Sequence, residues 1–196
     1  SYRRAPNLTN LNIYGNYYLD EAHTSGDYNL TSKDKLVNIN MGGTNLAIPN
    51  MQGATALETF KQTYGRGGQT NKLVDTGGVY RFENCNALKN LNFYATNLGE
   101  INFPLNGFTN TNLTYLDLRY TSIKGGVEGD ESEVIKQNTF SSCPNLEYVY
   151  IDSPKLLAQE INFNAFKLNS NLIGLNLRSY DRVNGILPDF SGNPSL

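Results

Sequence analysis

The chain has 196 residues, of which 17% are charged, and its 16 basic and 18 acidic residues give a formal net charge of −2. It has neither an excess of lysine and arginine nor an apolar run of about 20 residues, so we expect no nucleic-acid partner and no insertion into a membrane. Asparagine is the commonest residue, and the chain holds 13 tyrosines but no tryptophan.

A short pattern of leucines recurs from one end of the chain to the other. Its clearest copy runs through Leu113, Leu116, Leu118 and Ile123, where apolar and polar residues alternate. Seven copies and the start of an eighth begin at Leu8, Leu36, Leu57, Leu88, Leu113, Leu146, Leu172 and Leu196. The alternation predicts a short strand in each copy. Because so short a strand buries only one face, it needs a neighbouring copy stacked on it to complete a core.

A second anchor accompanies most copies: an apolar residue six positions before the first leucine, often with a small or polar residue three positions before. The anchors are Leu30, Met51 with Ala54, Phe82 with Cys85, Phe140 with Cys143, Phe166 with Asn169, and Phe190 with Asn193. The fifth copy departs, because Phe108 stands five positions before Leu113. We expect this segment to close the wall opposite the strands as turns or short helical pieces, with residues 131–140 the best candidate for a helical turn.

The copies differ mainly in the length of the segments between the strands. Residues 20–32, 64–79 and 124–132 are rich in Gly, Ser, Thr, Asn or Asp, which predicts protruding loops. Residues 1–196 therefore form one continuous stack of about seven repeats in a single domain. Since Leu196 opens another copy, we expect the chain to be a segment of a longer protein, or its end to pack on a partner.

On these leucines the chain resembles the leucine-rich repeat family, whose pattern is L-x-x-L-x-L-x-x-N-x-L. The match covers Leu8 to Leu196 and is weakest in the copy that begins at Leu57, where Gln62 stands at an inward apolar position. The resemblance implies a right-handed α/β solenoid, mostly β, with one parallel sheet and a turn-rich convex side. Its F-x-x-C-x-x-L steps also resemble repeats of bacterial surface proteins. The family's asparagine is kept at Asn16 but replaced by Thr44, Thr96, Thr121, Pro154 and Tyr180.

The residues that most often carry chemistry form no recognisable site. Cys85 and Cys143 hold the same position two turns apart, about 10 Å at a strand spacing of about 4.8 Å, so we expect two buried free thiols rather than a disulfide. No motif places a nucleophile near His23. The glycine-rich run 64–70 lacks the ending of a phosphate loop, and the acidic residues of 128–133 match no calcium loop. We therefore predict no catalytic, cofactor or metal site and no enzyme activity.

One face of the predicted sheet carries an organised set of aromatic and charged side chains. The aligned copies bring together Tyr115, Asp117, Arg119, Tyr148, Tyr150, Asp152 and Arg178. In one interpretation, Arg119, Asp152 and Arg178 simply pair as opposite charges on neighbouring strands. In the other, the tyrosines form a patch with Asp117 and Arg119 that binds a protein or a glycan, because aromatic and arginine side chains are enriched at interaction hot spots.

Two functions fit a repeat protein without an enzyme motif. The first is a structural role in which the chain binds other protein subunits of a larger assembly. In its low lysine content and abundant asparagine, glycine, threonine and tyrosine, the chain resembles repeat segments of virion structural proteins of tailed phages, such as tail or baseplate components. The alternative is an adhesin or receptor-recognition module that binds a surface glycan or host protein through the open face. These resemblances imply a virion or an extracellular, cell-surface location.

Overall fold

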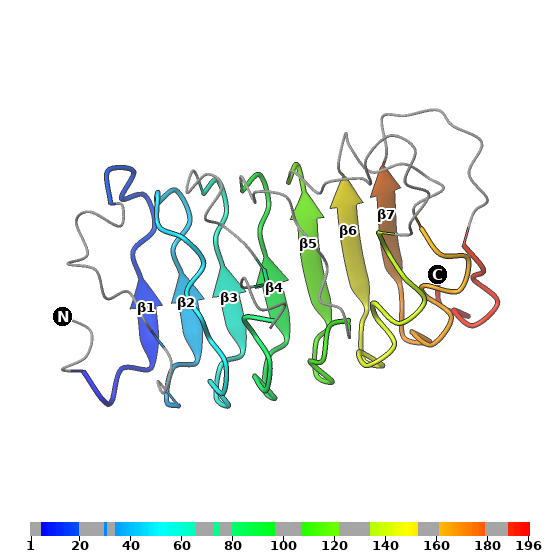
Figure 1. The fold of residues 1–196 in the computed structure, drawn as a ribbon, viewed down its shortest axis with the longest axis horizontal. Coiled ribbons are helices and arrows are strands. Elements are labelled where there is room, and N and C mark those ends of the chain that lie inside the picture. The colour runs from blue at the N-terminus through cyan, green and yellow to red at the C-terminus, as the bar shows by residue number, and fades with distance from the viewer. Residues whose placement is uncertain are drawn as a thin grey trace.

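The computed structural model describes residues 5–19, 30, 34–65, 73–74, 80–96, 107–121, 134–152, 161–178 and 188–196. Its strands are β1 (Asn10–Asn12), β2 (Asn38–Asn40), β3 (Thr59–Lys61), β4 (Asn90–Asn92), β5 (Tyr115–Arg119), β6 (Tyr148–Asp152) and β7 (Gly174–Arg178). They form one parallel sheet in chain order and run side by side along the molecule (Figure 1). The strand predicted for each of the seven copies is confirmed.

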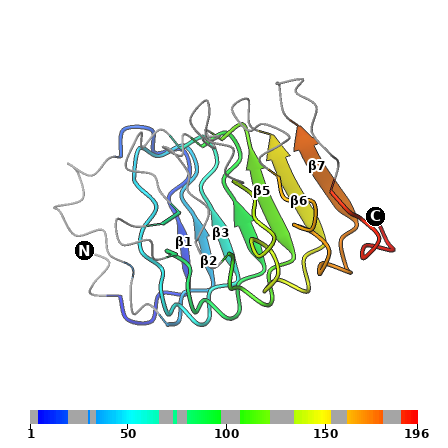
Figure 2. The same ribbon diagram turned by 45° about the vertical axis from the view of Figure 1, so that its right-hand side comes forward.

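The strands pair in the register that the aligned copies predict. Leu91 of β4 lies opposite Leu116 of β5, which lies opposite Val149 of β6. Equivalent residues therefore form continuous columns across the sheet, apolar on one face and polar or aromatic on the other. In the turned view of Figure 2, the connecting segments lie to one side of the row of strands. The apolar columns are buried beneath these segments, and the polar face stays open.

In the copy that begins at Leu57, the polar side chain of Gln62 is buried in the core and hydrogen-bonded to the backbone. The Gln62 side chain is fully buried where the other copies place an apolar residue. Its amide nitrogen donates to the carbonyl oxygen of Leu46 at 2.6 Å. Phe60 fills the adjacent core space by packing edge-on against Phe82, with ring centroids 4.9 Å apart. A main-chain acceptor therefore satisfies the amide nitrogen, while the buried Gln62 Oε1 accepts no hydrogen bond from a described residue.

A column of aromatic rings forms the wall opposite the sheet. Phe108 stacks on Phe140 at 5.6 Å between centroids, and Phe140 stacks on Phe166 at 5.1 Å. Phe108 keeps its place although its copy is one residue short, because the chain turns at Gly107 with a φ of 73°. A Cβ at Gly107 would lie 2.2 Å from the carbonyl oxygen of Asn138, so only glycine fits there.

The small or polar residue three positions before each first leucine links one copy to the preceding copy. The Asn169 amide donates to the carbonyl oxygens of Phe140 at 3.0 Å and Cys143 at 2.9 Å. Cys143 donates its S–H to the carbonyl oxygen of Phe108 at 3.3 Å. We call this set the turn ladder; it consists of Cys85, Asn110, Cys143, Asn169 and Asn193. It provides the contacts between copies that a buried asparagine after the strand would otherwise supply.

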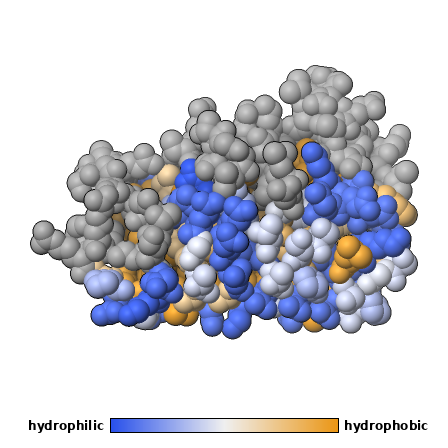
Figure 3. Space-filling view, turned by 60° about the horizontal axis from the view of Figure 1, so that its bottom comes forward, coloured by the Kyte–Doolittle hydropathy of each residue, from blue (hydrophilic) through white to orange (hydrophobic). Residues whose placement is uncertain are grey.

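A second row of amides lies outside the turn ladder, at the amino ends of the strands. The side chains of Asn112, Asn145 and Asn171 are exposed, and each donates to a carbonyl oxygen of the preceding copy at 2.7–3.0 Å. Figure 3 brings this side of the molecule forward, and hydrophilic colours dominate its described surface. The edge is therefore polar and internally hydrogen-bonded.

The expected helical pieces are absent from the part of the chain that the structure describes. At 134–140, Ile135 pairs with Ile161 of the next copy in a parallel bridge, and Thr139 Oγ1 accepts a bond from the Lys136 N–H. Ile135 is thus held by the neighbouring copy and the following residues form a turn, as the alternative of turns predicted. The α component of the expected fold is wrong for the described residues. No described segment is a helix that could cross a membrane. His23, residues 128–133 and most of the predicted loops lie outside the described residues.

Candidate functional site

Five of the seven predicted site residues come together on β5 and β6. Tyr115 lies opposite Tyr148, and Asp117 lies opposite Tyr150. The Tyr115 ring packs edge-on against Tyr150 at 5.7 Å between centroids, and the rings of Tyr148 and Tyr150 stack at 6.3 Å. We call Tyr115, Asp117, Arg119, Tyr148 and Tyr150 the tyrosine–arginine patch. All three rings are partly exposed on the open face of the sheet.

Asp117 fixes the arginine of this patch. The Asp117 carboxylate is 1% exposed. Its Oδ1 accepts bonds from the Arg119 backbone N–H at 3.1 Å and from Arg119 Nε at 3.0 Å, and its Oδ2 accepts from Nη2 at 2.6 Å. These bonds raise the pKa of Arg119 above its ordinary value. A bidentate pair of this kind holds the planar guanidinium in one orientation.

Tyr115 completes the set of donors around Asp117. Its hydroxyl donates to Asp117 Oδ2 at 3.1 Å. Partial burial, followed by the nearby carboxylate charge, raises the pKa of Tyr115 to about 12. The phenol therefore remains a neutral donor at physiological pH.

Arg119 lies between two tyrosine rings. Its Cζ is 4.7 Å from the ring centroid of Tyr150 and 5.2 Å from the ring centroid of Tyr94, which follows β4. Both distances fall in the range of a cation–π contact. Tyr94 is thus a site residue that the sequence analysis missed. In the aligned copies, Tyr94 holds the same open-face position as Arg119, and this could have indicated that the two are near each other. The alignment does not give the side-chain rotamer that brings the Tyr94 ring against the guanidinium.

A glycine on β7 makes room for the patch. Gly174 lies opposite Tyr148, and a Cβ at Gly174 would lie 2.7 Å from Cδ1 of the Tyr148 ring. The ring therefore lies over the β7 backbone. The sequence contained this signal, because glycine occupies an open-face position where most other copies carry a polar or aromatic side chain.

The three residues of the predicted charge ladder lie in register, and Arg119 does not make the predicted ion pair. Arg119, Asp152 and Arg178 lie opposite one another on β5, β6 and β7. The ion pair of Arg119 is nevertheless with Asp117 of its own strand, at 2.6 Å. Asp152 is 2% exposed, and its Oδ1 accepts no hydrogen bond from a described residue. The Arg178 side chain lies outside the described residues, so the pairing of Asp152 with Arg178 stays a prediction, and the patch as defined here leaves these two residues out.

The amide residues of the first strands share a local structure with Asp117. Oδ1 of Asn12, Asn40 and Asn92 accepts a bond from the backbone N–H two residues later, at 3.0–3.3 Å. Asp117 makes the same bond to Arg119. In β1, β2 and β4 this side-chain-to-backbone bond lies where the strand ends, whereas β5 continues to Arg119. The amide nitrogens of the three asparagines donate no hydrogen bond to a described residue.

The two cysteines are buried free thiols, as predicted. Burial raises the pKa of both Cys85 and Cys143 to about 12, so neither is a reactive thiolate near neutral pH. Among the described residues, no three His, Cys, Asp or Glu side chains are grouped so that they could hold a metal ion.

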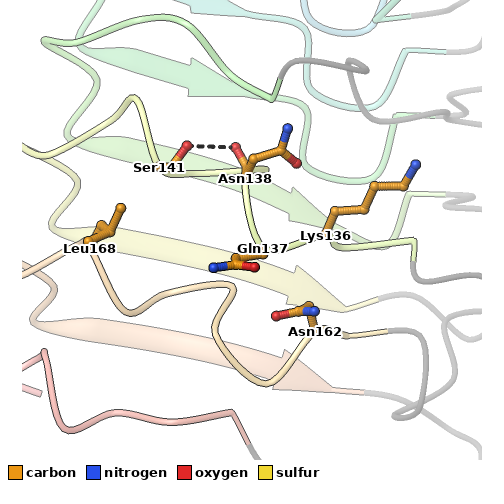
Figure 4. Close-up of a pocket in the computed structure, with 6 residues that line it drawn as sticks. All are labelled: Lys136, Gln137, Asn138, Ser141, Asn162 and Leu168. Atoms are coloured by element: carbon orange, nitrogen blue, oxygen red, sulfur yellow. Dashed lines mark hydrogen bonds between the residues drawn. The ribbon is translucent and has the colours of Figure 1, made fainter.

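A pocket of about 420 Å³ lies away from the open face, between the segments that precede β6 and β7 (Figure 4). Lys136, Gln137, Asn138, Ser141, Asn162 and Leu168 line it. The Ser141 hydroxyl donates to the carbonyl oxygen of Asn138 at 3.0 Å. Lys136 supplies the one ionisable group of this lining, which offers no pair of groups for acid–base chemistry.

Non-covalent binding is the chemistry that the open face supports. On β5 and β6 its buried carboxylate Asp117 is paired with Arg119, and its aromatic rings contact one another. Comparison with protein-family models and with curated proteins finds no match to this chain. The geometry of the tyrosine–arginine patch is therefore the basis on which a function can be proposed.

Proposed function

We propose that this chain is a non-enzymatic interaction module that binds another protein subunit of a larger assembly through the tyrosine–arginine patch. One observation carries the proposal: Asp117 holds Arg119 between the rings of Tyr94 and Tyr150. Tyrosine and arginine are enriched among the residues that dominate protein–protein binding energy. The patch has this composition and is ordered in the isolated chain.

Order in the unbound chain favours tight binding. Immobilising a flexible side chain at an interface costs about 0.5–1.5 kcal/mol. Arg119 and Tyr115 are already hydrogen-bonded to Asp117, so much of this cost is met during folding. A partner then gains contact area at a small entropic loss, which is the behaviour of a preorganised surface.

The architecture that we propose for the whole chain is a right-handed solenoid like that of leucine-rich repeats. The chain-order parallel sheet and the contacts between successive copies support it. In such a stack one face is shared by every copy, and extended binding surfaces are built on it. The tyrosine–arginine patch would then be one part of a surface that runs across β1 to β7.

A glycan is the second candidate partner, as for a surface adhesin. The amide row of the first strands favours it, because the Asn38 amide donates to Asn10 Oδ1 at 2.9 Å and both side chains face solvent. Amides bind hydroxyl groups without adding charge. This observation concerns β1 and β2 and does not involve the tyrosine–arginine patch.

Photo-crosslinking tests the protein-partner proposal. A photoreactive amino acid placed at Tyr148 should crosslink to one defined protein of the native assembly, and the crosslinked peptides identify that partner by mass spectrometry. The matched control places the same group at Leu168, which is exposed beside the pocket on the other side of the molecule. We expect crosslinks from position 148 and none to that partner from position 168.

Binding measurements with the identified partner complete the test. The double variant Tyr148→Ala, Tyr150→Ala should weaken its binding at least about tenfold, since each ring is a candidate hot spot. An unchanged affinity would remove the patch from the interface. Binding to a glycan array that is lost in the double variant Asn10→Ala, Asn38→Ala, with no protein crosslinked at position 148, would transfer the function to the glycan alternative.

A further inference from the structure

Three tyrosines extend the patch along the edge where the strands end. Tyr64, Tyr94 and Tyr120, which we call the tyrosine triad, follow β3, β4 and β5. The Tyr94 ring packs edge-on against Tyr64 at 5.5 Å and against Tyr120 at 5.3 Å between centroids. Tyr64 is 54% exposed and Tyr120 is 50% exposed. The three rings therefore form one continuous aromatic edge that solvent reaches.

Two rings of the triad are held on a strained backbone. Tyr64 and Tyr120 both have a φ of 55°, in the left-handed region. The equivalent residues of the first two copies are Gly15 and Gly43, with φ of 80° and 69°. Glycine adopts this conformation freely, whereas a bulky side chain does so at a cost in free energy. Ala95 of the fourth copy has a φ of 53°, so the left-handed turn is common to these copies, and Tyr64 and Tyr120 present their rings from it.

Arg119 joins the triad to the tyrosine–arginine patch. Its guanidinium lies over the Tyr94 ring on one side and the Tyr150 ring on the other. Nε and Nη2 donate to Asp117. The Nη1 donors bond to none of the described residues, and so they remain available to a ligand that crosses the triad.

The hydrogen-bonding groups beside the triad are mainly donors. Asn92 Oδ1 accepts the Tyr94 backbone N–H at 3.0 Å, and the amide nitrogen of the partly exposed Asn92 donates to no described residue. The oxygens of Asp117 are taken by Arg119 and Tyr115. Asp152, opposite Arg119, has an Oδ1 that accepts no bond from a described residue, but the residue is only 2% exposed. The strong acceptors are thus occupied or buried, while the Asn92 amide and Arg119 Nη1 keep free hydrogens. A complementary ligand presents acceptors and few donors.

A polyproline II segment has this chemistry. It makes no internal hydrogen bonds, so its carbonyl oxygens are free, and proline has no N–H to satisfy. Its rings dock on aromatic-lined surfaces. We propose that the tyrosine triad, together with Arg119, binds a proline-rich extended segment of the partner protein. This inference rests on the proposed function and names the chemistry of the partner.

Other ligands fit the same contacts less well. A sugar presents many O–H donors, and the strong acceptors beside the triad are already used. A quaternary ammonium needs a space between rings, but centroids 5.3–5.5 Å apart leave the rings in contact with one another. An anion would meet a guanidinium whose charge Asp117 already offsets.

Glycine substitutions give a test in which the variant should fold. Tyr64→Gly with Tyr120→Gly removes two rings and also relieves the left-handed strain, so the melting temperature should stay the same or rise. The probe is an oligoproline peptide, with a glycine–serine peptide of equal length as the control ligand, and calorimetry or NMR titration measures the Kd. We expect oligoproline to bind the natural chain, and the double variant to weaken that binding at least about tenfold.

The control variant is Tyr18→Ala, which removes a 91% exposed tyrosine outside the triad and should leave the Kd unchanged. Absence of oligoproline binding to the natural chain, or equal binding to the glycine variant, would overturn the inference. The inference would also be overturned if neutral oligosaccharides bound more tightly than oligoproline and the glycine double variant lost that binding. The proposed function is judged separately: it stands if Tyr148→Ala with Tyr150→Ala still disrupts the identified partner complex, whatever oligoproline does.

Discussion

Asp117 accepts three hydrogen bonds from Arg119, one from its backbone N–H and two from its guanidinium. Earlier copies place Asn12, Asn40 or Asn92 at the same position, where the side chain makes the backbone bond alone. The variant Asp117→Asn should therefore separate the two roles of Asp117, because it keeps the hydrogen bond to the Arg119 backbone N–H and removes the ion pair with the Arg119 side chain.

Asp117→Asn should destabilise the fold by about 1 kcal/mol, because a third of the Arg119 side chain is exposed and its pairing is partly screened. Asp117→Ala should cost about 1–3 kcal/mol, since it also leaves the Arg119 backbone N–H without its acceptor. Urea unfolding measures both. Equal losses for the two variants would mean that the backbone bond contributes nothing.

The turn ladder makes a second prediction. Asn169→Ala removes the donor to the carbonyl oxygens of Phe140 and Cys143 and should cost about 1–3 kcal/mol. Asn169→Cys should cost less, because cysteine at the equivalent place in other copies donates to one carbonyl, as Cys143 does to Phe108. The midpoints of denaturant unfolding compare the two variants. A cysteine variant as unstable as the alanine variant would argue against interchange of these residues in the ladder.

Two glycines with similar backbone angles should differ sharply in their tolerance of alanine. Gly15 has a φ of 80° and open space around its Cβ position, so Gly15→Ala should cost about 1–2 kcal/mol of backbone strain. Gly107 has a φ of 73°, and its Cβ would lie 2.2 Å from Asn138 O, which adds overpacking against backbone. We expect about 2–4 kcal/mol for Gly107→Ala. Thermal unfolding of the two variants under the same conditions checks the difference.

Alkaline pH should unfold the protein partly through its thiols. Burial raises the pKa of Cys85 and Cys143 to about 12, whereas the unfolded chain releases these protons near the ordinary value of 9.0. The folded state binds more protons between these values, so the stability is complete below about pH 9 and falls as the pH rises toward 12. The double variant Cys85→Ala, Cys143→Ala should lose less stability over this range. Unfolding curves on both sides of the range test this, and parallel losses in the two proteins would contradict it.

The sheet was predictable from the sequence because its pattern repeats. Equivalent leucines must stack to bury one face of each strand, so aligning the copies sets both the strands and their register. Residues 134–140 were not predictable in this way, because contact with a neighbouring copy holds Ile135 extended against Ile161 and overrides the local preference.

For the site, the sequence predicted only which residues hold equivalent positions on neighbouring strands, that is, the columns of the open face. The columns brought Tyr115, Tyr148 and Tyr150 together, as the structure confirms. They could not show that Arg119 turns back to Asp117 on its own strand rather than across to Asp152, because that choice depends on rotamers. For the same reason they indicated neither the contact of Tyr94 with Arg119 nor the strained backbone of Tyr64 and Tyr120.

The direction of the turn ladder has a consequence for how the molecule comes apart. Each amide or thiol reaches backward to the copy before it, as Asn193 does to Phe166 and Asn169. Cooperativity therefore passes from neighbour to neighbour, as in a line of coupled links. Weakening one link near the C-terminal end should release the units beyond it while those before it stay protected. Amide hydrogen exchange would then show a step in protection at the altered link instead of a uniform loss.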